Sequence, residues 1–76
     1  MPRITPVHYR KLVRLLQREG FELARERGDH MVFSKPNVAR PVVVPRYDPL
    51  PVFIIKNILR TAGISRERYF ELLETA

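Results

Sequence analysis

The side chains best suited to proton transfer in this chain are its two histidines, His8 and His30. An imidazole changes its protonation state near neutral pH, so a histidine can serve as a general base or a general acid. His30 directly follows Gly28-Asp29, a pair that is typical of a hairpin turn. His8 lies near the start of a predicted helix, and nothing in the sequence places it near His30. The chain has no cysteine and no pair of histidines at ligand spacing, so we expect no metal and no cofactor.

Positive charge is the second chemical feature of the sequence. The 76 residues include 14 Lys and Arg against 8 Asp and Glu, a net charge of +6. On so small a protein this excess favours a polyanionic partner, most often a nucleic acid. Basic side chains recur on one helical face at Arg10, Arg14 and Arg18, with Lys11 beside them. This stripe suits a phosphate backbone; the alternative is an arginine-rich face that contacts only solvent.

The length and hydropathy predict one small soluble domain over residues 1–76. No apolar run approaches the roughly 20 residues needed to cross a bilayer, so we expect no membrane association. The first residues lack the apolar stretch of a signal peptide. A cytoplasmic location is therefore expected.

Three segments show the apolar spacing of helices. The first is predicted to open at Thr5-Pro6, as N-cap and first helical residue, and to close at Gly20. The second is predicted over residues 52–62 and the third after a Ser65 cap. Gly63 is the expected stop of the second helix. The predicted core faces of the three helices are Tyr9, Leu12, Val13 and Leu16; Ile54, Ile55, Ile58 and Leu59; and Tyr69, Leu72 and Leu73.

Between residues 21 and 44 the apolar period changes to two, which predicts strands. A two-residue turn at Gly28-Asp29 would place Phe21 and Phe33 on opposite faces of the hairpin. A three-residue turn over residues 27–29 would bring both onto one face. Because one buried face fixes the register, we predict the three-residue turn, which leaves His30 on the open face of the sheet.

A third short strand is expected around Val42-Val43-Val44, between Pro41 and Pro45, which mark it as an edge strand. The predicted order is thus α-β-β-β-α with a short C-terminal helix. This is an α+β fold in which a three-stranded antiparallel sheet carries helices on one face.

This order is that of the double-stranded-RNA-binding fold, and the sequence resembles the HicA toxins, the RNA-cleaving members of HicA–HicB toxin–antitoxin pairs. The similarity extends over residues 9–65, and the order and spacing of its pieces make it specific. The matching stretches are Leu15-Leu16, Gly20-Phe21-Glu22-Leu23, Arg27-Gly28-Asp29-His30-Met31-Val32-Phe33, Val43-Val44-Pro45 and Ile58-Leu59-Arg60-Thr61-Ala62-Gly63-Ile64-Ser65.

The resemblance implies a metal-independent endoribonuclease that cleaves messenger RNA, with His30 as the catalytic acid or base. It also implies a HicB-like antitoxin that covers the His30 face. The alternatives are a non-catalytic RNA-binding module, and a degenerate toxin that still binds its antitoxin. Cations are needed to bind and stabilise RNA phosphates. The basic residues expected to do so are Arg10, Lys11, Arg14, Arg18, Arg25, Arg27, Lys35 and Arg46.

The sequence departs from the family pattern at three places. Asp29 replaces the usual serine, Tyr47 stands where a histidine is common, and Phe53-Ile54 replaces glycine and threonine. Asp29 could favour the charged form of His30, or could simply tolerate the turn. Tyr47 is a weak candidate for a general acid; the favoured alternative is an aromatic ring packed on the proline-rich loop.

Overall fold

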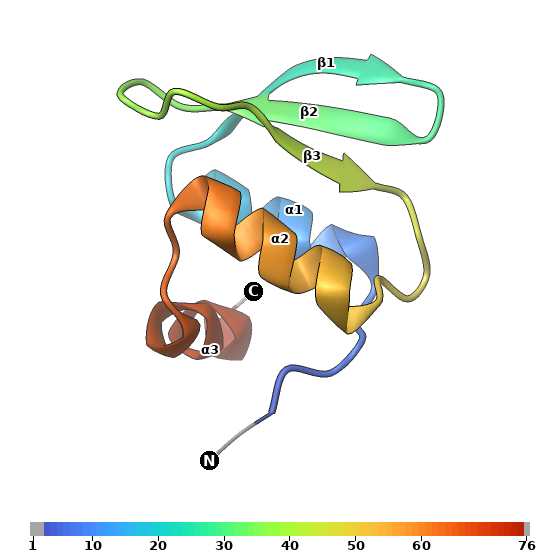
Figure 1. Cartoon of the computed structure of the whole chain (residues 1–76), viewed down its shortest axis with the longest axis vertical. Coiled ribbons are helices and arrows are strands. Elements are labelled where there is room, and N and C mark those ends of the chain that lie inside the picture. The colour runs from blue at the N-terminus through green and yellow to red at the C-terminus, as the bar shows by residue number, and fades with distance from the viewer. Residues whose placement is uncertain (1–2, 76) are drawn as a thin grey trace.

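A computed structural model describes residues 3–75 as three helices and a three-stranded antiparallel sheet (Figure 1). The elements in chain order are α1 (Tyr9–Arg18), β1 (Glu22–Arg27), β2 (His30–Ser34), β3 (Val42–Pro45), α2 (Val52–Ala62) and α3 (Arg66–Thr75). The predicted α-β-β-β-α order with a C-terminal helix is confirmed. Within the described range, no helix has the length and apolar character needed to cross a membrane.

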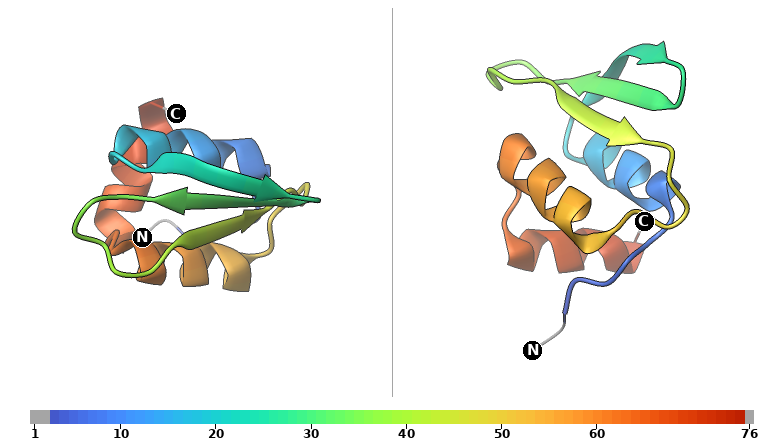
Figure 2. Two further views of the ribbon diagram at one scale, coloured as in Figure 1. Left: turned by 90° about the horizontal axis from the view of Figure 1, so that it is seen from above. Right: turned by 45° about the vertical axis from the view of Figure 1, so that its right-hand side comes forward.

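Helices cover only one face of the sheet. α1 and α2 lie side by side beneath the strands, and α3 packs below them, away from the sheet (Figures 1 and 2). The strand order β1-β2-β3 makes β3 an edge strand, as its flanking prolines predicted. The buried core is Leu12, Leu15, Leu16, Phe21, Phe33, Val42, Val44, Leu50, Ile55, Ile58, Leu59, Tyr69 and Leu72.

The predicted start of α1 at Thr5-Pro6 is wrong, because the helix begins at Tyr9. Val7 forms an antiparallel bridge with Leu50, in which the Leu50 N–H donates to the Val7 carbonyl at 2.7 Å. This bridge holds the preceding segment extended. His8 is therefore the N-cap of α1, and its Nδ1 accepts from the Arg10 N–H at 3.1 Å.

The predicted three-residue turn between β1 and β2 is also wrong. Arg27 pairs with His30, so the turn consists of Gly28 and Asp29 alone. Gly28 has a φ of 59°, a left-handed conformation that glycine adopts without steric cost. A glycine in this conformation at the first turn position is the pattern of a type II′ hairpin.

A bulge in β1 reverses the faces of the residues that come before it, so that the two-residue turn is compatible with one buried face. Leu23 pairs with Phe33 and Arg25 pairs with Val32, so Ala24 has no partner on β2. The extra residue shifts the alternation by one, as bulges do. Phe21, which directly precedes β1, thus lies on the same buried face as Phe33. His30 lies on the open face, as predicted.

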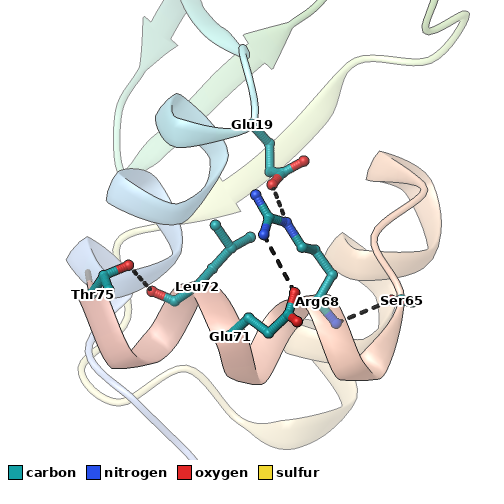
Figure 3. A network of polar contacts seen from close by, with 6 residues as sticks. All are labelled: Glu19, Ser65, Arg68, Glu71, Leu72 and Thr75. Atoms are coloured by element: carbon teal, nitrogen blue, oxygen red, sulfur yellow. Dashed lines mark hydrogen bonds and ion pairs between the residues drawn. The ribbon is translucent and has the colours of Figure 1, made fainter.

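The other two helices match their predictions. α2 covers residues 52–62 and ends at Gly63, whose φ is 72°. The Ser65 Oγ caps α3 by accepting from the Arg68 N–H at 3.1 Å (Figure 3). The Arg68 guanidinium also contacts Glu19 at 2.7 Å and Glu71 at 3.3 Å, which ties α3 to the end of α1.

Tyr69 carries the least satisfied polar group of the described core. Its ring is buried, and its hydroxyl has no hydrogen-bond partner within residues 3–75. A buried polar group without a partner costs about 1–3 kcal/mol. We therefore expect Tyr69→Phe to raise the free energy of unfolding by about 1 kcal/mol at neutral pH, as measured by urea denaturation.

The same substitution has a pH signature. Burial raises the pKa of the Tyr69 phenol, so the unfolded chain loses this proton before the folded chain does. Below the unfolded pKa of about 10 both states keep the proton; as pH rises from there toward the folded value, ionisation of the unfolded chain lowers the free energy of unfolding of the wild type. The stability advantage of Tyr69→Phe should widen above pH of about 10. A variant less stable than wild type at neutral pH would show that the hydroxyl is satisfied in solution.

Candidate active site

His30 is the first residue of β2 and lies on the open face of the sheet. It pairs with Arg27 on β1 and with Pro45 on β3, and its side chain is 47% exposed. Directly opposed residues in an antiparallel sheet point to the same face. The Arg27 side chain is therefore on the same face as the imidazole.

Asp29 orients the His30 ring. The Nδ1 atom of His30 lies 2.9 Å from the Oδ1 atom of Asp29. A carboxylate oxygen accepts hydrogen bonds, so in the neutral form of the ring this contact favours the tautomer with the proton on Nδ1 and the lone pair on Nε2. Within residues 3–75, Nε2 has no hydrogen-bond partner. A carboxylate that fixes the tautomer of a histidine in this way prepares the other nitrogen to accept a proton.

Asp29 is not needed for the left-handed conformation of the turn. Gly28 supplies it, and Asn37 is the one non-glycine residue with positive φ in the described part of the chain. The interpretation of Asp29 as a residue that merely tolerates the turn therefore loses its main support. The contact with His30 accounts for its side chain.

Arg46 holds the turn that carries these two residues. Its backbone N–H donates to the Asp29 carbonyl at 2.7 Å, and its guanidinium donates to the Gly28 carbonyl at 3.4 Å. The guanidinium also forms an ion pair with Glu26. Glu26 pairs with Met31, which shares its face with the buried Val44, so this ion pair lies on the helix side of the sheet. Arg46 thus supports His30 from the opposite face.

The other strand cations divide into two groups. Arg25 and Arg27 lie on the open face, and neither side chain has a hydrogen bond or ion pair to another described residue. Lys35 follows β2 at its far end, about 16 Å along the strand from His30 at 3.3 Å per residue. Its Nζ lies 5.5 Å from the centre of the Phe21 ring, a cation–π contact. The structure brings the arginines to the end of the sheet that holds His30, but not Lys35.

The basic stripe of α1 lies in the helix layer. α1 lies in the layer beneath the sheet (Figure 2), so the stripe belongs to a different layer from the open face that carries His30. Arg10, Lys11 and Arg14 line a shallow hollow of about 220 Å³ together with His8. Arg18 donates to the Thr75 carbonyl at 2.8 Å, where it satisfies the C-terminal end of α3.

His8 and Tyr47 were the two alternatives for a second proton-transfer group. Besides capping α1 through Nδ1, His8 places Nε2 3.7 Å from the Asp48 carboxylate and stacks on Tyr9 at 4.7 Å. Both ring nitrogens therefore have structural partners. Tyr47 is two residues past Pro45, the β3 partner of His30, and its ring is partly exposed. Tyr47 thus stays the candidate at this end of the molecule.

Sequence reasoning missed two features of this end. One is the role of Arg46 as a brace for the turn, which becomes visible only when the register places Glu26, Met31 and Val44 in one row across the sheet. The other is the exposure of Phe53, whose ring is 72% exposed in the first turn of α2. The sequence contained one signal of this exposure, because Phe53 stands where the family pattern has a small residue.

Comparison with known proteins identifies the family of the chain. No curated protein matches the chain. The family described as the HicA toxin of bacterial toxin–antitoxin systems matches residues 9–64. The match begins at the first residue of α1 and ends just before α3, so it includes the whole sheet, the turn and His30. The chain therefore belongs to the HicA toxin family.

Proposed function

We propose that this toxin is a metal-independent endoribonuclease that cleaves messenger RNA, with His30 as its general base. Family membership makes the protein a toxin of a toxin–antitoxin system. The observation that carries the proposal is the Asp29–His30 contact on an open face, with Nε2 unoccupied by other described residues. The neighbouring Arg27 adds the positive charge that phosphoryl transfer needs.

The proposed reaction begins at a ribose 2′-hydroxyl. Nε2 of His30 accepts its proton, and the Asp29 carboxylate holds the resulting imidazolium in place. The 2′-oxygen then attacks the adjacent phosphorus and displaces the 5′-oxygen, which yields a 2′,3′-cyclic phosphate and a 5′-hydroxyl. Arg27 stabilises the negative charge that grows on the phosphoryl oxygens. The departing oxygen takes a proton from Tyr47 or from solvent.

The antitoxin partner implied by the family is of the HicB type. We propose that it inhibits the toxin by covering the open face of the sheet. Val32 and the exposed Val43 are directly opposed on this face and offer an apolar anchor, which Arg25 and Arg27 flank. An acidic partner surface would pair with these arginines as RNA phosphates do and would associate quickly by electrostatic steering.

We expect His30→Ala to abolish cleavage and leave the thermal midpoint nearly unchanged, because the half-exposed imidazole contributes little to packing. The assay is incubation of purified protein with a long messenger RNA, with and without EDTA. His8→Asn is the matched control, since asparagine keeps the N-cap while removing the other imidazole. Cleavage by His30→Ala at the wild-type rate would refute the assignment. Binding without cleavage by wild type would favour a non-catalytic RNA-binding module.

We expect Asp29→Asn to lower kcat by roughly tenfold or more while KM changes little, because an amide can donate to Nδ1 and so favour the wrong tautomer. Nitrogen NMR of the His30 ring should show the tautomer shift directly. Asp29→Ser introduces the residue that is usual in the family at this position; its hydroxyl can accept from Nδ1, so this variant should recover much of the activity. Unchanged kcat and tautomer in Asp29→Asn would make Asp29 a turn residue only.

We expect the arginines of β1 and of α1 to bind phosphates rather than bases. Replacing Arg25 and Arg27 with glutamine, or Arg10 and Arg14, should lower the salt slope of single-stranded RNA binding by about 1.4, or 0.7 for each lost contact. The measurement uses His30→Ala protein, so that the RNA stays intact. Arg40→Gln, an exposed position on the β2–β3 connection, serves as the control. A slope that stays constant in both double variants would identify these faces as merely solvated.

A further inference from the structure

The outward face of α2 has an unusual composition for a solvent-exposed helix. Phe53 is 72% exposed, which makes it the most exposed of the large apolar side chains described. Lys56, Asn57 and Arg60 are also exposed. The spacing of these four residues is i, i+3, i+4 and i+7, so they form one stripe opposite the buried face of the helix. We call them the α2 outer stripe.

The charge of this stripe and of the sequence on either side of it is of one sign. The sequence has no acidic residue between Pro49 and Arg66. Within residues 3–75, Lys56, Asn57 and Arg60 have no hydrogen bond or ion pair to another side chain. A hollow of about 310 Å³ beside the stripe is lined by Lys56 together with Arg3, Ile4, Val52 and Arg66. The surface therefore attracts anions along its whole length.

The start of α2 adds to this field. Its N-cap is Pro51, which provides no capping side chain, and its first turn contains no acidic residue. The first backbone N–H groups and the positive end of the helix dipole thus lie beside the exposed ring of Phe53. An aromatic face next to uncompensated positive charge matches both parts of a nucleotide, the base and the phosphate.

We propose that the α2 outer stripe binds single-stranded RNA, with a base stacked on Phe53 and phosphates on Lys56 and Arg60. This inference rests on RNA being the substrate in the proposed function and deepens it by naming the unpaired form. Bases of a duplex are stacked on one another, whereas unpaired bases are free to stack on aromatic side chains. α2 begins at the same end of the molecule as the β1–β2 turn (Figures 1 and 2), so the Phe53 end of the stripe is the end nearer to the turn that precedes His30.

A lone tryptophan tests the stacking directly, because the chain contains none. The probe is Phe53→Trp in His30→Ala protein, titrated with a single-stranded oligoribonucleotide and with the same strand annealed to its complement. Tryptophan fluorescence should be quenched by the single strand and much less by the duplex. Ala39→Trp, on the connection at the opposite end of the sheet, should report no quenching. Equal quenching by both RNAs, or none by either, would overturn the proposal.

Binding constants give a second, independent measurement. Phe53→Ala should weaken single-stranded RNA binding by on the order of tenfold, and Phe53→Leu should weaken it similarly because leucine keeps apolar area without a π face. Arg60→Gln should lower the salt slope by about 0.7 while Arg40→Gln does not. Unchanged RNA affinity in Phe53→Ala, with a weakened antitoxin complex, would make the stripe a protein interface and refute the proposal. If the tryptophan is quenched by single-stranded RNA but the wild-type protein cleaves no RNA, the stripe proposal is supported and the endoribonuclease proposal is refuted.

Discussion

The pairing register of β1 and β2 determines both the core and the candidate active site. Side chains alternate between the two faces of a strand, so a shift of one residue would expose Phe33 and bury His30. Two local devices fix the register, the glycine-initiated turn and the bulge at Ala24. Arg46 then bonds the carbonyls of both turn residues, through its backbone N–H to Asp29 and through its guanidinium to Gly28. The guanidinium also pairs with Glu26 on the helix side, so this side-chain brace lies on the face opposite to the proposed chemistry.

The parts of the fold that depend on neighbouring residues could be predicted from the sequence. α2 ends at Gly63 and α3 is capped by Ser65, and both signals act within one helical turn. The start of α1 could not be predicted because the bridge between Val7 and Leu50 overrides the local Thr5-Pro6 signal. The tight turn could not be predicted for the same kind of reason, since the bulge that makes it compatible with a buried Phe33 is a property of two paired strands.

The candidate site shows a similar division. The choice of His30 as the candidate catalytic residue followed from its residue type and the family resemblance. Its position on the open face followed from the alternation of the strand. The hydrogen-bond partners of the basic side chains could not be predicted, because an arginine in the sequence does not reveal whether its guanidinium binds a phosphate or a backbone carbonyl. Arg18 closes the end of α3 and Arg46 braces the turn, whereas Arg25 and Arg27 keep their charges toward solvent. Only packing distinguishes these two uses of arginine.

The two outer strands have a consequence for the behaviour of the toxin before it meets a partner. An outer strand presents unpaired backbone groups that can recruit the same strand of another molecule and start aggregation. β3 is short, follows Pro41 and ends at Pro45, and a proline has no N–H to donate to such a ladder. β1 is longer, but charges at Glu22, Arg25, Glu26 and Arg27 and the kink at Ala24 discourage self-pairing. The arginines that we propose to contact RNA thereby also help to keep the free protein from assembling with itself.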